Sequence, residues 1–124
     1  MFRSLVITYI LWSCSLIIKG QHPDSQDKTL SLLFIGDIMC HDEQIWSAEN
    51  RETGEYDYDT VFSYIKPEIS DAGIVIANFE VTLAGPPFKG YPQFRSPDEL
   101  AAACRNAGID FFALANNHCA DRGE

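Results

Sequence analysis

The sequence contains few basic residues. Nine Lys and Arg stand against 18 Asp and Glu among 124 residues, which gives a formal net charge of −9. The basic residues are scattered singly, so no cluster of them can neutralise successive phosphates of a duplex. This shortage excludes nucleic acid as an expected partner. A hydrophobic fraction of 46% still provides enough apolar side chains for a buried core, which excludes a wholly disordered chain.

Cysteine is also scarce. Cys14 lies in the apolar N-terminal segment, and the rest of the chain holds Cys40, Cys104 and Cys119. Three thiols at irregular spacing form neither a disulfide framework nor a zinc ribbon. We therefore expect each of the three to be a small buried side chain.

No hydrophobic run is long enough to span a membrane comfortably. Residues 5–18 are mostly apolar and follow Arg3, but a membrane-spanning helix needs roughly 20 apolar residues. A basic residue followed by a short apolar run is typical of a secretory signal, so residues 1–20 are predicted to be a signal peptide. An uncleaved segment, or lipidation at Cys14, is the alternative. In each case the protein is expected to be exported to the periplasm or the cell surface.

Downstream of the signal, residues 21–29 are predicted to be a polar linker and residues 30–124 a folded domain. Three short apolar runs in that domain indicate strands covered on both faces. Helical patterns separate these runs, and this alternation is typical of an α/β fold with parallel strands. The three runs are residues 30–35, 74–77 and 111–115.

The two segments between the strands predict helices. In the first, apolar residues recur every three or four positions around Pro67, which indicates two short helices or one kinked helix. The second has a predicted capping box, with Ser96 as N-cap and Glu99 as its partner, and a predicted end at Gly108. The Gly- and Pro-rich residues 82–93 are expected to form a long loop that takes part in a binding site. The expected buried stripes are Tyr58, Phe62, Ile65, Ile69 and Ala72, then Leu100, Cys104 and Ala107.

Each predicted strand is followed by polar side chains that can bind divalent metals. Ligands of parallel sheets bind beyond the carboxyl ends of the strands. Carboxylates and amides suit Mn²⁺ or Mg²⁺, and imidazole suits Zn, Fe or Mn. Taken singly, each residue also has a structural explanation as a helix cap, a loop or turn residue, or a hydrogen-bonded histidine. Their occurrence at three equivalent strand ends favours a site formed by Asp37, Asn78, Glu80, Asn117, His118 and Asp121.

Three stretches resemble a known family. They are the GDIM sequence at residues 36–39, DAGIVIANFE at 71–80, and AGIDFFALANNHCADRG at 107–123. Together they resemble the opening part of the CapA family of poly-γ-glutamate capsule biosynthesis proteins, which is similar in fold to calcineurin-like metallophosphoesterases. The resemblance covers about residues 30–123. It implies the N-terminal part of a four-layer α/β/β/α sandwich, a cell-envelope location and a site for one or more Mn, Zn, Fe or Mg ions.

The resemblance also implies roles for the site residues. His118 is expected to donate a proton to the leaving group or to stabilise the transition-state charge, with Asp121 as its orienting partner. The metal would polarise a phosphoryl or acyl oxygen and lower the pKa of a bound water. Its expected ligands are Asp37, Asn78, Glu80 and Asn117.

The sequence departs from the metallophosphoesterase pattern in two respects. Met39 stands where the first motif has a histidine, and His41 lies two residues further on. The family also continues well beyond residue 124, through a second sheet that supplies further histidines. The sequence is therefore expected to be an N-terminal fragment that is inactive by itself.

Two functions are consistent with these residues. The first is an exported metal-dependent hydrolase that acts on an anionic cell-surface polymer or a phosphoester. The second is a non-catalytic envelope component that binds such a polymer or the capsule synthesis and export machinery, because a fold does not fix an activity. A small domain without any site is disfavoured by the three matching strand ends.

The predicted signal peptide can be tested on the secreted protein. N-terminal sequencing of the mature product is expected to begin near Gln21, or at Cys14 if that residue is lipidated. A cytoplasmic product that retains Met1 would contradict both outcomes.

Overall fold

The computed structural model describes residues 28–123. The predicted signal peptide and most of the predicted linker therefore lie outside the described residues. Within residues 28–123, no helix combines the length and apolar character needed to cross a membrane. The elements in chain order are β1 (Leu32–Ile38), α2 (Asp42–Ala48), β2 (Glu49–Asn50), β3 (Glu55–Tyr56), the 3₁₀ helix η1 (Asp59–Phe62), α3 (Lys66–Ile69), β4 (Ile74–Phe79), α4 (Glu99–Ala107) and β5 (Phe111–Ala113).

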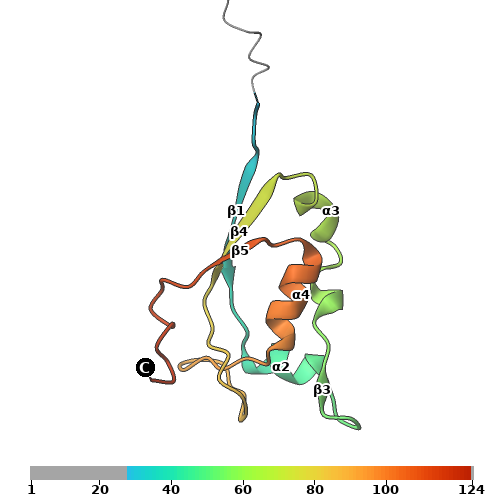
Figure 1. The fold of residues 1–124 in the computed structure, drawn as a ribbon. Coiled ribbons are helices and arrows are strands. Elements are labelled where there is room, and N and C mark those ends of the chain that lie inside the picture. Colours follow the sequence, from blue (N-terminus) through green and yellow to red (C-terminus); the bar gives the residue numbers. More distant parts are fainter. Residues whose placement is uncertain (1–27, 124) are drawn as a thin grey trace, which may run out of the picture.

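A three-stranded parallel sheet forms the centre of the fold, in the order β1-β4-β5. Helical segments connect one strand to the next, as Figure 1 shows. The α/β prediction is therefore confirmed. Because all three strands run the same way, their carboxyl ends lie at one edge of the sheet, and the residues that follow them are brought together there.

One face of this sheet carries the core. The helices lie on one side of the strands in Figure 1. Val75, Ala77 and Phe79 on β4 are buried in the same apolar cluster as Leu100 and Cys104 on α4. Full burial of side chains such as Val, Leu and Phe contributes about 1.5–3 kcal/mol each. Alternate residues of β4 and the apolar stripe of α4 thus pack into one core.

The opposite face of the sheet exposes large apolar side chains. Leu32 is 51% exposed, Phe34 69% and Phe111 58%. The strand register pairs Leu32 with Ile74, and Ile76 with both Phe34 and Phe111, so these residues form adjacent rows across the sheet. The prediction that the strands are covered on both faces is wrong for the described part of the chain. An apolar run identifies a strand, but it does not specify which segment covers each face.

The connection from β1 to β4 contains two short helices, the first of the two alternatives predicted around Pro67. They are η1 and α3, and Phe62 and Ile69 are their buried residues. Pro67 lies in the first turn of α3. Backbone N–H groups in this turn have no hydrogen-bond partner within the helix, so the lack of an N–H in proline breaks no helical bond. Ile65, a member of the predicted stripe, is instead 42% exposed just before α3. The helix α2 and the β2–β3 hairpin were not indicated by the sequence pattern.

The predicted start of the second helix needs correction. The N-cap of α4 is Asp98, two residues after the predicted Ser96. Ser96 is fully buried, and its N–H donates to the carbonyl oxygen of Thr82 at 2.9 Å, so its backbone belongs to the preceding loop. The predicted end is confirmed, because Gly108 follows α4 in the left-handed conformation with φ of 113°. The predicted stripe is also buried: Leu100, Cys104 and Ala107.

The long loop between β4 and α4 is held at its tip. Lys89 and Arg95 exchange two backbone hydrogen bonds of 2.9 and 2.8 Å. Between them, the N–H of Gly90 donates to Oδ1 of Asp42 at 2.6 Å. A Cβ atom at Gly90 would lie 2.6 Å from the nitrogen of Asp42 and 2.9 Å from Cα of His41. Only glycine therefore allows the loop to approach the start of α2 this closely.

This contact predicts a strong effect of Gly90→Ala. We expect the added methyl to push the loop away from α2 and to lower the unfolding free energy of the complete protein by about 1–3 kcal/mol in urea denaturation. Gly36→Ala is the matched control, because a Cβ there would meet no atom within 4 Å. Equal unfolding free energies for the two variants would contradict the close packing at Gly90.

Candidate functional site at the carboxyl edge of the sheet

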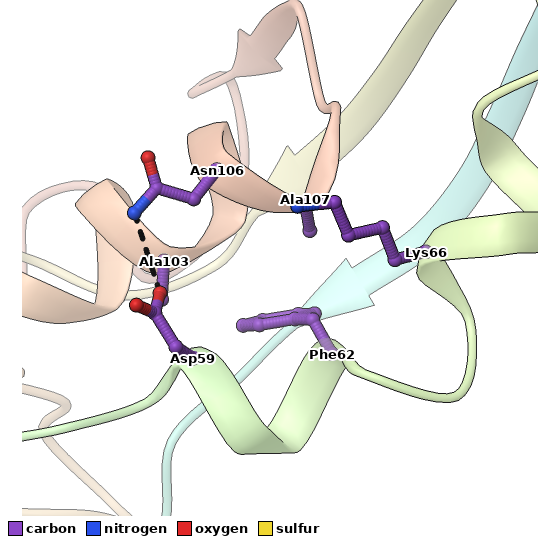
Figure 2. Close-up of a pocket in the computed structure, with 6 residues that line it drawn as sticks. All are labelled: Asp59, Phe62, Lys66, Ala103, Asn106 and Ala107. Carbon is purple, nitrogen blue, oxygen red and sulfur yellow. Dashed lines mark hydrogen bonds between the residues drawn. The ribbon is translucent and has the colours of Figure 1, made fainter.

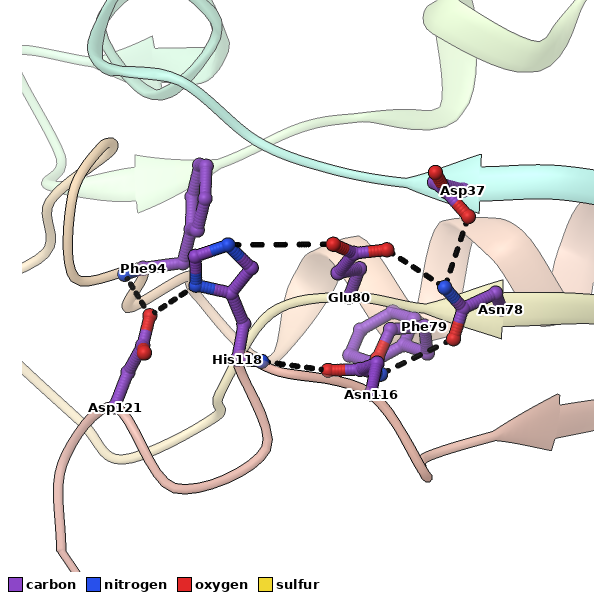
Figure 3. Close-up of polar contacts among 8 residues, drawn as sticks. All are labelled: Asp37, Asn78, Phe79, Glu80, Phe94, Asn116, His118 and Asp121. Atoms are coloured by element: carbon purple, nitrogen blue, oxygen red, sulfur yellow. Dashed lines mark hydrogen bonds and ion pairs between the residues drawn. The ribbon is translucent and has the colours of Figure 1, made fainter.

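Hydrogen bonds connect the ends of β1 and β4 through one carboxamide. Nδ2 of Asn78 donates to Oδ1 of Asp37 at 2.8 Å and to Oε2 of Glu80 at 2.7 Å. Figure 3 shows the two carboxylates pointing at this nitrogen from neighbouring strands. The structure thus brings together three of the residues predicted from sequence.

A β-bulge in β1 directs Asp37 into this site. Ile35 pairs with Ala77, but it is Asp37, not Gly36, that pairs with Asn78. Without the extra residue, Gly36 would lie opposite Asn78, and the side chain of Asp37 would point to the helix-covered face, because side chains alternate along a strand. A bulge re-aims one side chain in this way at many functional sites.

The turn after β5 presents His118 to the same edge. Nδ1 of His118 lies 2.8 Å from Oδ2 of Asp121. The same carboxylate oxygen accepts the backbone N–H of Phe94 at 2.7 Å, and the Phe94 ring packs edge-on to the imidazole with centroids 4.8 Å apart. Phe94, the residue directly after the loop predicted at residues 82–93, therefore fixes Asp121, and Asp121 fixes the imidazole (Figure 3).

This arrangement determines which histidine nitrogen faces the other carboxylates. An ionised carboxylate only accepts hydrogen bonds, so neutral His118 carries its proton on Nδ1 and leaves a lone pair on Nε2. Nε2 lies 4.0 Å from Oε1 of Glu80. The side chains of His118, Glu80 and Asp121 are only 12–14% exposed. An oriented, partly buried imidazole of this kind is suited to proton transfer.

Only one of the two adjacent asparagines in the turn joins the network. Nδ2 of Asn116 donates to Oδ1 of Asn78 at 3.1 Å and to the carbonyl oxygen of Phe79 at 3.0 Å. Asn117, which the sequence analysis assigned to the site, is exposed. Two neighbouring residues of the same type carry the same chemical signal, so the sequence pattern could not separate them. A ligand role for Asn117 stays a prediction.

The carboxylates fit a cation by chemistry but do not complete a metal centre. Asp37 and Glu80 each direct one oxygen at the Asn78 nitrogen and each have a second carboxylate oxygen, and hard divalent cations prefer oxygen ligands. Among residues 28–123, no three Asp, Glu, His or Cys side chains lie close enough to hold a metal. The described residues therefore offer a partial ligand set.

Two cavities of similar size lie on different parts of the molecule. One of about 390 Å³ borders the His118 turn, and Leu83, Leu114 and Arg122 are among the residues that line it. The other, of about 360 Å³, lies between η1 and α4 (Figure 2). In the second, Nδ2 of Asn106 donates to Oδ1 of Asp59 at 3.3 Å. That cavity shares no residue with the hydrogen-bond network in Figure 3.

The three cysteines of the domain differ in burial. Cys40 and Cys104 are buried as predicted, and Sγ of Cys40 lies 3.5 Å from the hydroxyl oxygen of Tyr58. Burial raises the pKa of the Cys40 thiol and raises the pKa of Cys104 to about 12. The prediction of burial is wrong for Cys119, which follows His118 in the surface turn and is exposed.

This difference predicts the order of alkylation. Iodoacetamide at pH 8 is expected to modify Cys119 well before Cys40 or Cys104, because the thiolate is the reactive form and burial disfavours it. Peptide mass spectrometry over a time course measures the order, and Cys119→Ser should remove the fast phase. Faster modification of Cys104 than of Cys119 would contradict the packing of α4.

Comparison with known proteins identifies the class to which this α/β domain belongs. Residues 31–124 match the family described as bacterial capsule synthesis protein PGA_cap. The chain therefore belongs to this family, and the predicted resemblance is confirmed. A relative in Bacillus anthracis, the capsule biosynthesis protein CapA, is 27% identical over 106 residues, which cover 79% of this chain and 24% of the relative. The chain thus spans about a quarter of that relative's length. No solved structure matches the chain.

Proposed function

We propose that this protein is an exported, metal-dependent hydrolase of capsule polymer metabolism, in which His118 transfers the proton. Membership of the capsule synthesis family supports the biological context. The observation that carries the proposed chemistry is the 2.8 Å contact between Nδ1 of His118 and Asp121, which leaves Nε2 directed toward Glu80. The substrate class is a phosphoester or an anionic cell-surface polymer.

In this proposal, His118 is the general acid. The acid is the imidazolium form, which carries a proton on both nitrogens: Nδ1–H donates to Asp121, and Nε2–H gives its proton to the leaving group, which leaves the neutral imidazole with a lone pair on Nε2. The Phe94 ring packs edge-on against the imidazole in this position. A positioned general acid contributes about 10²–10⁴-fold to a rate.

A divalent cation would be held by Asp37 and Glu80, with Asn117 as a further ligand from the turn. Asn78, predicted as a ligand, directs its Nδ2 at both carboxylates and its Oδ1 at Asn116, so in this orientation it would position the two carboxylates and not bind the cation itself. When bound, the cation would polarise an oxygen of the substrate and lower the pKa of a bound water. The charge of the site supports this role. Asp37, Glu80 and Asp121 place three carboxylates at one edge of the sheet, and an anionic substrate would be repelled from them unless a cation offset their charge.

We also infer that a second β-sheet covers the exposed face of the first, as in a metallophosphoesterase-like sandwich. Leu32, Phe34 and Phe111 form an apolar surface that is unusual for a face in contact with water. Sheets that pack face to face bury rows of this kind. Such a layer would also bring further side chains to the partial ligand set.

The proposed general acid is tested by His118→Ala in the complete protein. With an alkyl phosphodiester, whose alkoxide leaving group has to be protonated, and Mn²⁺, we expect kcat to fall by about 10²–10⁴-fold, while elemental analysis finds the metal content unchanged. Asp37→Asn is the comparison variant and is expected to lose metal and turnover together.

These measurements distinguish the hydrolase from the non-catalytic binding component, the two functions that the sequence analysis left open. If His118→Ala keeps the wild-type kcat, His118 is not the general acid. If the wild-type protein binds the metal but hydrolyses no phosphoester or capsule polymer, the hydrolase proposal is wrong, and a non-catalytic binding role is favoured.

A further inference from the structure

Asn116 connects the His118 turn to the neighbouring strand. Its Oδ1 accepts the backbone N–H of His118 at 3.0 Å, two residues along the chain. Its Nδ2 donates to Oδ1 of Asn78 and to the carbonyl oxygen of Phe79, both across the sheet on β4. Figure 3 shows this side chain between the turn and the strand. One half-buried carboxamide thus joins the proton-transfer residue to the residue that bridges the carboxylates.

The hydrogen-bonding capacity of Asn78 depends on this contact. A carboxamide has two N–H donors and one acceptor oxygen. Asn78 uses its nitrogen for Asp37 and Glu80, and its oxygen faces Asn116. If Asn78 turned over, its oxygen would face two carboxylates, and its nitrogen would face the Nδ2 donor of Asn116. The donor on Asn116 therefore keeps Asn78 in the orientation that holds both carboxylates.

The same side chain sets the position of His118. The contact to the His118 N–H is a local turn that Asn, Asp and Ser favour. The contacts to Asn78 and Phe79, the two residues directly before Glu80, anchor that turn on β4. The separation of 4.0 Å between Nε2 of His118 and Oε1 of Glu80 is therefore fixed in part by Asn116.

We propose that Asn116 is a positioning residue that holds the His118 imidazole and the Asn78 carboxamide in the positions that the reaction requires. The inference rests on the proposed function of His118 as general acid. It requires asparagine at this position, because aspartate would place an acceptor oxygen against the acceptors of Asn78 and Phe79, and serine would not reach β4.

Asn116→Asp and Asn116→Ser in the complete protein test this role. Each retains an acceptor for the His118 N–H but lacks the donor to β4, so kcat is expected to fall by about 10–100-fold with little change in KM. In protein labelled with ¹⁵N at Asn and His, the Asn78 side-chain amide and the His118 backbone N–H resonances are expected to shift. Asn106→Asp is the matched control, because it removes an amide donor and adds the same charge on α4, away from the site.

The spectroscopic measurement separates this inference from the proposed function. If the wild-type protein lacks hydrolytic activity, the general-acid proposal fails, and the NMR shifts alone decide whether Asn116 positions the two residues. The inference is overturned if both Asn116 variants leave these resonances at the positions seen with Asn106→Asp. It is also overturned if both retain the kcat of an active wild-type protein. Should Asn116→Asp fail to fold, the uncharged Asn116→Ser variant gives the same test.

Discussion

Two carboxylates at the end of neighbouring strands repel each other unless a donor lies between them, and the Asn78 amide provides that donor. Its nitrogen contacts both Asp37 and Glu80, and its oxygen is held by Asn116 from the turn after β5. The network therefore ties all three strand ends of the sheet together. The position of His118 depends on it, because the His118 turn is anchored through Asn116.

A second set of contacts holds the site from the other side. The loop after β4 is fixed at its tip by Gly90 on α2, and its last part presents the Phe94 N–H to Asp121. The His118–Asp121 pair is thus positioned by a loop, while Asp37 and Glu80 are positioned by strands. The exposed apolar face beside them is the observation on which the proposed second layer rests.

Much of the fold could be predicted from local patterns. The spacing of apolar residues predicts the three strands and the short helices around Pro67. The end of α4 at Gly108 follows from the preference of glycine for the left-handed conformation. The start of α4 could not be predicted, because the Ser96 backbone bonds to Thr82 across the loop instead of capping the helix. A capping residue indicates only a local preference for a helix start. Here the contact between Ser96 and Thr82 moves the start of α4 to Asp98.

The sequence by itself determined the chemical types at the site, since a carboxylate or an imidazole is recognisable without any structure. It also determined that these types follow parallel strands and so meet at one edge. The tertiary structure decided which side chains point there. The bulge at Gly36 turned Asp37 to the open face, and the turn after β5 selected Asn116 over Asn117 for the network. Both choices depend on strand register and turn geometry, which arise from contacts between segments far apart in the chain.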